Sequence, residues 1–231
     1  MNIPDRLERK LVRRSRGNLV YRSRMFWRAL EGKVFHRQAK RSLKGGRYSM
    51  LHQVPRGGVG VEIGVWKGDF SEALLNHLQP ERLYMVDPWA LPESDRVLFP
   101  HLKSGATIGV DGTVVTTQQD LDRVYIAVVD RFADDPRAVM LRSTSVDAAQ
   151  TIDDASLDWI YVDGSHYYDD VLDDLTAWRP KLDSSGVIFG DDYYWRDKDR
   201  RYTVRRAVDE FIDRIEPRAW VVFRGQFMIW L

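Results

Sequence analysis

From Gly57 onward, short apolar runs alternate with longer amphipathic stretches, and this alternation constrains the fold more than any other feature of the chain. The runs are rich in β-branched residues, as buried strands are, whereas the stretches between them repeat apolar residues at helical spacing. Strands that alternate with helices predict βαβ units and a largely parallel sheet. The expected strands cover 59–65, 83–87, 138–142, 157–163 and 186–191, and the expected helices cover 69–79, 118–133, 167–182 and 202–215.

The chain ends with two further strand-like runs, AWVVF and FMIWL, which are joined through Gly225. A glycine between two apolar runs is typical of a hairpin, so we expect a mostly parallel seven-stranded sheet that closes with an antiparallel pair. The segment 90–117 is too irregular for a plain connection, and we expect it to be an insertion beside a binding site. The segments 45–56 and 193–202 are expected to shape the same pocket.

The charges are unevenly divided along the chain. Residues 1–48 hold 15 of the 35 Lys and Arg but only 3 of the 34 Asp and Glu, a local charge of +12, and the remainder carries −11. This asymmetry, hidden in a net charge of +1, predicts a basic arm before an acidic body. Apolar spacing within the arm is helical, so we expect a basic helical N-terminal arm at 1–48 and one α/β domain at 49–231.

The 231-residue chain contains no cysteine. Disulfides, thiolate zinc sites, iron–sulfur clusters and cysteine nucleophiles are therefore excluded. There is no run of about 18 apolar residues, the length that a membrane-spanning helix needs. The first residues are charged and lack the apolar segment of a secretory signal. These features predict a cytoplasmic protein.

The sequence VEIGVWKGDFS at 61–71 has the pattern of a strand, a glycine-bearing turn and a helix start. Gly64 and Gly68 allow the backbone to approach a ligand closely, and the amides of a helix start are free to bind it. Glu62 lies within the strand, where a carboxylate is costly unless it has a partner. No G-x-G-x-x-G motif follows the strand, which disfavours a dinucleotide.

The second expected strand ends at Asp87, about 20 residues after the glycine turn, a position that suits hydrogen bonds to ribose hydroxyls. Trp89 follows closely, and we place Trp89 and Glu62 among the cofactor-binding residues as well. The alternative for Asp87 is a helix cap or a turn residue.

Three aspartates stand at the ends of the last two expected parallel strands: Asp163 at one, Asp191 and Asp192 at the other. Neighbouring strands lie about 4.8 Å apart, and their carboxyl ends open into the ligand crevice of α/β sheets. Carboxylates that converge there raise one another's pKa, and a divalent cation would relieve the repulsion. Oxygen ligands favour Mg²⁺, with Mn²⁺ or Ca²⁺ as alternatives. The competing interpretation is that these aspartates cap helices or face solvent.

Several motifs occur in a fixed order: VEIGVWKG, YMVDPW, LRSTSVDAA, LDWIYVDGSHYYDDVLDDL, GVIFGDDY and VRRAVDEF. In this order they resemble the class I S-adenosylmethionine-dependent methyltransferases, and more narrowly the family of macrocin-type sugar O-methyltransferases and cephalosporin-hydroxylase-like proteins. The resemblance covers about residues 55–231. It implies a Rossmann-like fold, in agreement with the terminal hairpin, which dinucleotide dehydrogenases normally lack.

The resemblance also implies roles for residues. The turn around Gly64 and Gly68 would lie against the methionine part of S-adenosylmethionine. Asp87 would hold the ribose, and Thr144 and Ser145 would flank the adenine. Magnesium-dependent O-methyltransferases carry their metal ligands at the positions of Asp163, Asp191 and Asp192.

His166 lies three residues after Asp163 and could accept a proton from a bound hydroxyl. Catechol-type O-methyltransferases carry their basic residue at this spacing. Sugar-modifying relatives often have an acidic residue where this chain has Ser165. Two alternatives therefore stay open, a base at His166 or no dedicated base.

These observations predict an S-adenosylmethionine-dependent, Mg²⁺-dependent O-methyltransferase that acts on a hydroxyl of a small molecule or glycan, such as a sugar or a catechol-like diol. The metal would bind the hydroxyl and lower its pKa, and the oxygen would attack the methyl in line with the sulfur. Asp163 and His166 are the expected catalytic residues.

Two alternatives come from the basic arm. The first is an RNA ribose O-methyltransferase, although other nucleic-acid chemistry is disfavoured by the missing Asn/Asp-Pro-Pro-aromatic motif and by the missing cysteine. The second is a cofactor-binding protein without enzymatic activity that docks to a membrane through the arm, where Phe26 and Trp27 stand among basic residues. An arm that supports a homo-oligomer is the simpler role.

Overall fold

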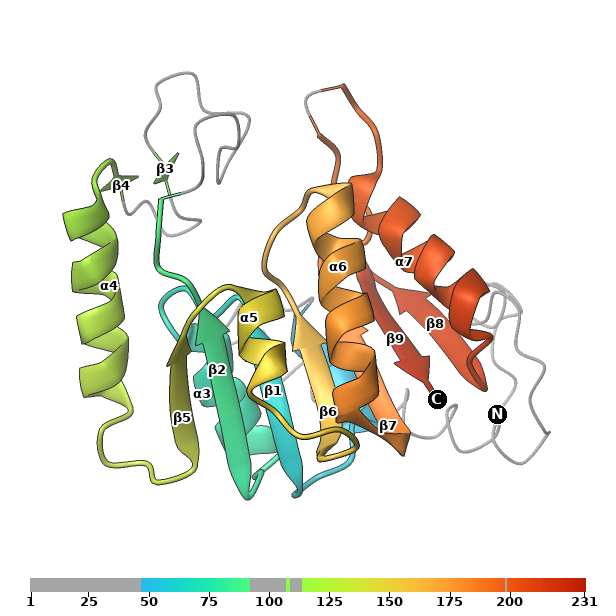
Figure 1. The fold of residues 1–231 in the computed structure, drawn as a ribbon, viewed down its shortest axis with the longest axis horizontal. Helices are drawn as coiled ribbons and strands as arrows, with labels where there is room; N and C mark the ends of the chain where they lie inside the picture. Colours follow the sequence, from blue (N-terminus) through green and yellow to red (C-terminus); the bar gives the residue numbers. More distant parts are fainter. Residues whose placement is uncertain (1–46, 92–106, 109–113, 198) are drawn as a thin grey trace, which may run out of the picture.

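The computed structural model describes residues 47–91, 107–108, 114–197 and 199–231 (Figure 1). Residues 1–46 of the expected basic arm and most of the expected insertion at 90–117 lie outside the described residues. The division into an arm at 1–48 and a domain at 49–231 therefore stays a prediction.

A seven-stranded sheet in the order β5-β2-β1-β6-β7-β9-β8 forms the centre of the molecule. The pairs β5–β2, β2–β1, β1–β6 and β6–β7 are parallel, and β7–β9 and β9–β8 are antiparallel. This is the Rossmann-like class I methyltransferase arrangement that the sequence predicts. The strands are β1 (Val59–Ile63), β2 (Arg82–Asp87), β5 (Ala138–Arg142), β6 (Leu157–Val162), β7 (Leu182–Gly190), β8 (Ala219–Phe223) and β9 (Gln226–Trp230).

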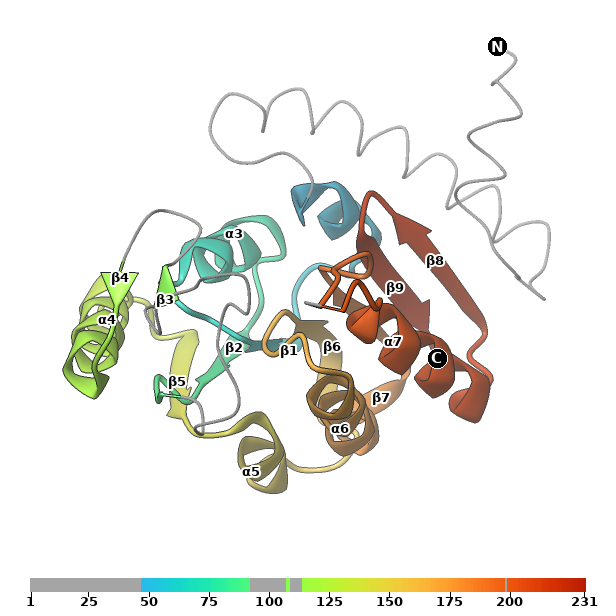
Figure 2. The same ribbon diagram turned by 90° about the horizontal axis from the view of Figure 1, so that it is seen from above.

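Helices cover both faces of the sheet (Figure 2). One apolar cluster joins one face to η1, α3 and α4, and a second joins the other face to α5, α6 and α7. The helices are η1 (Arg47–Gln53), α3 (Asp69–His77), α4 (Gln118–Arg131), α5 (Ser145–Gln150), α6 (Tyr168–Trp178), η2 (Arg179–Lys181) and α7 (Thr203–Ile215). Because both faces of the sheet are covered, the central strands are mostly apolar, which is why they read as nearly continuous runs in the sequence.

Local chemistry sets several of these boundaries. Thr117 begins α4 with a capping box, in which its side chain accepts from the Asp120 amide and the Asp120 side chain accepts from the Thr117 amide. The helix expected at 167–182 is shorter than predicted, because α6 ends at Trp178 and the chain continues as the 3₁₀ turn η2. Pro180, two residues after Trp178, cannot continue the α-helical hydrogen bonding.

The terminal hairpin is confirmed. Arg224 and Gly225 join β8 to β9 with φ values of 55° and 90°, and positive φ at both central residues is the geometry of a tight two-residue hairpin turn. The structure also contains a two-stranded sheet, β3 (Thr107–Ile108) with β4 (Val114–Val115), within the expected insertion.

Within the described part of the chain, no helix has the length and apolarity required to cross a membrane.

Candidate functional site

The carboxyl ends of β6 and β7 bring the predicted acidic residues together. The two strands pair in parallel with Val162 opposite Gly190, so Asp163 and Asp191 leave the sheet at the same level. The Asp163 amide donates to the Ile63 carbonyl (2.9 Å) and the Asp191 amide donates to the Val162 carbonyl (3.3 Å). The expectation that these aspartates stand at adjacent strand ends is therefore met by the fold.

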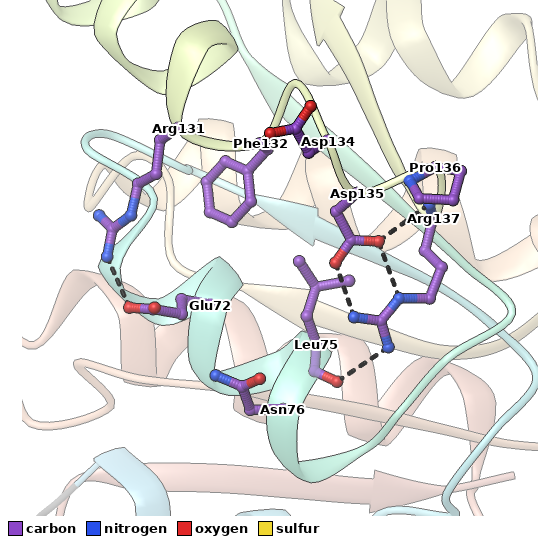
Figure 3. A pocket seen from close by; sticks show the side chains of 9 residues that line it. All are labelled: Glu72, Leu75, Asn76, Arg131, Phe132, Asp134, Asp135, Pro136 and Arg137. Carbon is purple, nitrogen blue, oxygen red and sulfur yellow. Dashed lines mark hydrogen bonds and ion pairs between the residues drawn. The ribbon is translucent and has the colours of Figure 1, made fainter.

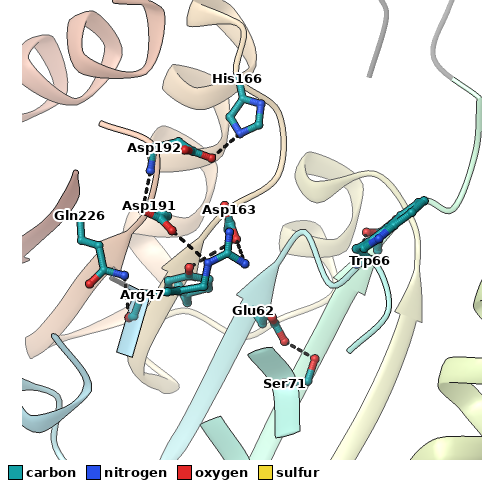
Figure 4. Close-up of polar contacts among 11 residues, drawn as sticks. Arg47, Glu62, Trp66, Ser71, Asp163, His166, Asp191, Asp192 and Gln226 are labelled. Atoms are coloured by element: carbon teal, nitrogen blue, oxygen red, sulfur yellow. Dashed lines mark hydrogen bonds and ion pairs between the residues drawn. The ribbon is translucent and has the colours of Figure 1, made fainter. Parts of the chain in front are cut away.

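A guanidinium lies between the two strand ends, and sequence reasoning did not single it out. Arg47, the first residue of η1, places Nη1 2.9 Å from Asp163 Oδ2 and Nε 2.9 Å from Asp191 Oδ2 (Figure 4). Its backbone carbonyl accepts a hydrogen bond of 2.6 Å from Gln226 Nε2 in β9. Arg47 falls within the segment 45–56 that was expected at the pocket, but no local motif marks it.

Burial and charge together set the protonation of this cluster. Burial is the largest cause that raises the pKa of Asp163, to about 7; Arg47 opposes the rise, and Asp191 and Asp192 add to it. The pKa of Asp191 is also raised, again by burial first. Burial works against the charge of Arg47, but Tyr161, Asp163 and Asp191 outweigh it and raise the pKa of Arg47. The mutual repulsion predicted from sequence is present, as a smaller cause than desolvation.

Asp192 is paired with His166. His166 Nε2 lies 2.8 Å from Asp192 Oδ2, and the imidazole stacks on Trp195 with centroids 4.9 Å apart. Burial alone would lower the pKa of His166, but the hydrogen bond and charge of Asp192 raise it. Asp192 itself has φ of 59°, a left-handed backbone conformation that residues other than glycine rarely adopt. Such conformations often occur at functional sites.

Within the described ranges, a single group of acidic and histidine side chains has ligand atoms close enough to hold a metal ion, all within 4.8 Å of one another: Asp163, His166 and Asp192. It shares two members with the predicted set. Asp191 lies beside it and is engaged by Arg47. The metal-binding roles stay predictions.

The glycine turn after β1 packs tightly against its neighbours. Gly64 and Gly68 have φ of 90° and 78°. A Cβ on Gly64 would stand 2.3 Å from the Asp163 carbonyl oxygen, and one on Gly68 would stand 2.6 Å from the Phe132 ring. Both positions therefore require glycine for the fold itself, and their predicted contact with a cofactor remains to be tested.

Asp87, at the end of β2, holds this turn in place. Its carboxylate accepts hydrogen bonds from the amides of Trp66 (2.9 Å) and Trp89 (2.8 Å). The Trp89 indole is only 1% exposed and donates from Nε1 to the Trp66 carbonyl (2.9 Å). Both residues shape the turn where the cofactor is expected, and their direct contact with it stays a prediction.

Glu62 is 1% exposed in β1, and the Ser71 hydroxyl donates to its Oε2 (Figure 4). Burial is the main cause that raises its pKa, to about 8. Its Oε1 has no hydrogen-bond partner among the described residues. A buried polar atom without a partner is costly, so this atom is suited to form a hydrogen bond with a bound molecule.

Thr144 and Ser145 begin α5 beyond the end of β5. The Thr144 hydroxyl donates to Asp147 Oδ2 (2.7 Å), and its oxygen caps the helix by accepting from the Asp147 amide. Ser145 Oγ accepts from Trp178 Nε1 (2.8 Å), which ties α5 to α6. The Ser145 side chain is thus engaged by the fold, and any contact of these residues with adenine is untested.

A separate surface pocket lies between α3, the end of α4 and the start of β5 (Figure 3). Its charged residues pair with one another, Arg131 with Glu72 (2.7 Å) and Arg137 with Asp135 (2.6 Å). None of the predicted site residues lines it. Because β5 is parallel to β2, β1 and β6, its start lies at the sheet edge opposite the carboxyl ends of the strands. Those ends hold Asp163, Asp191 and Asp192, here called the acidic cluster.

Comparison with known proteins agrees with this architecture. A family model described as a methyltransferase domain matches residues 61–193. The O-methyltransferase NovP is 20% identical with a TM-score of 0.51, over 77% of this chain and 72% of that chain. A candidate rRNA methylase from Clostridium thermocellum is 11% identical with a TM-score of 0.51, over 81% of this chain and 95% of that chain. At these identities the two structures show a shared fold.

Other matches are partial. The uncharacterized protein y4gI of Sinorhizobium fredii is 43% identical over 49 residues, which are 21% of this chain and 5% of that protein. The chain also spans about half the length of two matching spermidine synthase structures, 55% and 54% of those chains.

Proposed function

We propose that this chain, which belongs to the methyltransferase-domain family and is a class I S-adenosylmethionine-dependent methyltransferase, methylates a hydroxyl oxygen. The proposed acceptor is a small molecule or glycan, such as a sugar or a catechol-like diol. One observation carries the proposal: three aspartates and a histidine meet at the carboxyl ends of β6 and β7. Acid and base groups at that edge can bind and deprotonate a hydroxyl.

The residues at the ends of β1 and β2 suit the methyl donor. When bound, S-adenosylmethionine supplies a methyl group on a positively charged sulfur. Glu62 Oε1, which has no partner among the described residues, is available for a hydrogen bond with the methyl donor. The turn fixed by Asp87 brings the backbone of Gly64 and Trp66 to the same edge. A site closed to water would favour this step, because the positive sulfonium and the developing negative oxygen neutralise each other as the methyl is transferred.

His166 is the proposed base. In the neutral imidazole, an Nε2–H that donates to Asp192 leaves the lone pair on Nδ1 free to accept the hydroxyl proton. Asp192 thereby orients the ring, and the stacked Trp195 limits its rotation. Asp192 has a second oxygen for another partner.

The acidic cluster fits a divalent cation by its chemistry. Oxygen atoms of Asp163 and Asp191 already bind a cationic group, the guanidinium of Arg47. The two carboxylates therefore stabilise positive charge at this position. We propose that Asp163, Asp191 and Asp192 can hold Mg²⁺, an ion that prefers carboxylate oxygens. When bound, Mg²⁺ would act as a Lewis acid toward the substrate hydroxyl.

Methyl-labelled S-adenosylmethionine and a panel of catechols, sugars and other alcohols, with Mg²⁺ or with excess chelator, test this proposal. We expect label on an acceptor bearing adjacent hydroxyls, and loss of transfer in chelator. Asp191→Ala should abolish metal-dependent turnover while S-adenosylmethionine binding, measured by calorimetry, survives. Asp213→Ala, an exposed substitution on α7, is the matched control.

Four outcomes would count against parts of the proposal. Full activity in chelator would reject the metal. Transfer to RNA alone would favour the ribose alternative, and transfer to amines alone would reject O-methylation. For His166→Ala, an unchanged pH–rate profile would reject its role as the base.

A further inference from the structure

Arg47 is held at the acidic cluster from several sides. Its guanidinium contacts Asp163 and Asp191, and its Cζ lies 5.7 Å from the centre of the Phe70 ring in α3. Its carbonyl is bound by Gln226, which is itself buried in β9. Its position is therefore set by the sheet and by α3, unlike that of an arginine on an open surface.

The segment that carries Arg47 is part of the core. Tyr48, Met50 and Leu51 of η1 are buried in the same apolar cluster as α3 and the sheet. The Tyr48 ring packs 5.5 Å from the Phe70 ring. This anchoring holds the first residue of η1 over the strand ends, while the Arg47 side chain keeps 36% of its surface exposed. The long side chain can therefore leave the carboxylates while its backbone stays in place.

A guanidinium and a divalent cation cannot use these oxygens together. Arg47 takes Oδ2 of Asp163 and Oδ2 of Asp191, each at 2.9 Å. A magnesium ion bound to the same atoms would sit at about 2.1 Å from them, within a few ångströms of the guanidinium. Positive charges so close repel strongly in a buried site. A metal ion that uses these two oxygens therefore requires the guanidinium to leave first.

We propose that Arg47 is a tethered counter-cation that competes with the divalent metal ion for Asp163 and Asp191. Without metal its single positive charge partly offsets the charge of the two carboxylates, and its two contacts fix their side chains. With metal its guanidinium swings away from them. Arg47 is thus a positioning residue that sets the metal affinity of the site. This inference rests on the metal site of the proposed function, but its test requires no methyl transfer.

The direction in which metal affinity changes when Arg47 is removed decides whether Arg47 competes with the metal or supports its binding. If Arg47 only oriented the ligands for the metal, its removal would weaken metal binding. If it competes, its removal frees two carboxylates and strengthens binding. Manganese is a suitable probe because Mn²⁺ accepts the same oxygen ligands and its free concentration can be measured by electron paramagnetic resonance.

The experiment titrates the full-length protein with Mn²⁺ in the absence of methyl donor and acceptor. We expect Arg47→Gln to bind Mn²⁺ at least about tenfold more tightly than the wild type, equivalent to about 1.4 kcal/mol. Arg47→Lys keeps the charge but loses the fork that spans two carboxylates, so its affinity should fall between the two. Arg131→Gln, which removes the ion pairs with Asp69 and Glu72 on the far side of α3, should leave affinity unchanged.

A stability measurement supplements the titration. Arg47→Gln leaves two carboxylates uncompensated, so its melting temperature without metal should fall, and saturating Mn²⁺ should raise it by more than it raises that of the wild type. If Arg47→Gln does not fold, Arg47→Lys still tests the direction of the change.

Unchanged or weaker Mn²⁺ binding in the folded Arg47 variants would overturn the inference, as would an absence of Mn²⁺ binding in both wild type and variants. The proposed O-methylation fails on a different result, the lack of methyl transfer to any hydroxyl acceptor. The two failures are therefore distinguishable.

Discussion

Asp174 shows how a single buried carboxyl, outside the acidic cluster, can govern the pH dependence of stability. It lies in α6 and is 6% exposed. Burial raises its pKa to about 7; a hydrogen bond with Ser145 opposes the rise, and the neighbouring charges of Asp170 and Asp173 add to it. The native state therefore retains a proton that the unfolded chain releases at a lower pH.

The sign follows from this difference in proton binding. Between about pH 4 and pH 7 the native state binds more protons at Asp174, so the free energy of unfolding falls as the pH rises. We expect Asp174→Asn, which cannot titrate, to be about as stable as the wild type near pH 4. It should gain relative to the wild type by up to about 4 kcal/mol near pH 7, since one pKa unit corresponds to about 1.4 kcal/mol.

Urea unfolding at a series of pH values measures this difference, in which the other titrating groups cancel. Asp213→Asn, an exposed substitution on α7 that is not among the charges acting on Asp174, is the control and should follow the wild type. Parallel curves for Asp174→Asn and the wild type would contradict the expectation.

Single residues differ in how far sequence can place them. Asp163 and Asp191 could be placed because each directly follows an apolar run, and strand ends of a parallel sheet meet at one edge. Arg47 could not, because it precedes Asp191 by 144 positions and its place depends on Gln226 in the last strand. Asp174 was missed for a related reason, since an aspartate among several on an amphipathic helix gives no sign of burial.

At the scale of elements, the turn between β1 and α3 couples the fold to the site. Gly64 sits where β1 and β6 end side by side, and the missing Cβ lets the Asp163 carbonyl approach. Gly57 offers a natural comparison, because its φ of 79° is also left-handed but a Cβ there would meet nothing within 4 Å.

We expect Gly57→Ala to cost about 1 kcal/mol, the penalty of a left-handed alanine. Gly64→Ala should lower the free energy of unfolding by at least about 3 kcal/mol, because the steric overlap with the Asp163 carbonyl adds to that penalty. S-adenosylmethionine affinity should also fall in Gly64→Ala and stay unchanged in Gly57→Ala. Urea unfolding and calorimetry check both, and equal losses in the two variants would show that backbone conformation alone matters.

Elements with a regular apolar pattern are the ones that sequence predicts. The strand at 138–142 matches β5, and the helix at 202–215 matches α7 within a residue. By contrast, β7 begins at Leu182, before the expected 186, since the polar stretch 183–185 has the composition of a turn yet continues the strand. The helix α5 was missed, because it has only six residues and buries two alanines.

At the scale of the whole molecule, two apolar layers share one sheet. Leu74 of α3 is buried on one face and Leu175 of α6 on the other. Neither layer has a sheet of its own, so neither can keep its apolar surface covered once the strands separate. The molecule should therefore unfold as one unit, although each layer is built from a different set of helices.

Leu74→Ala and Leu175→Ala test this cooperativity. Each removes a buried side chain and should lower the free energy of unfolding by about 2–5 kcal/mol. If the sheet couples the layers, each variant keeps a single urea transition with the same midpoint by far-ultraviolet circular dichroism and by tryptophan fluorescence. The dependence of the free energy of unfolding on urea concentration should also equal that of the wild type. Separate midpoints for the two probes in either variant would mean that one helical layer can detach while the other, with the sheet, remains folded. In that case the strand ends at Asp163 and Asp191 would stay folded with the sheet, and binding at the site would not stabilise the detached layer.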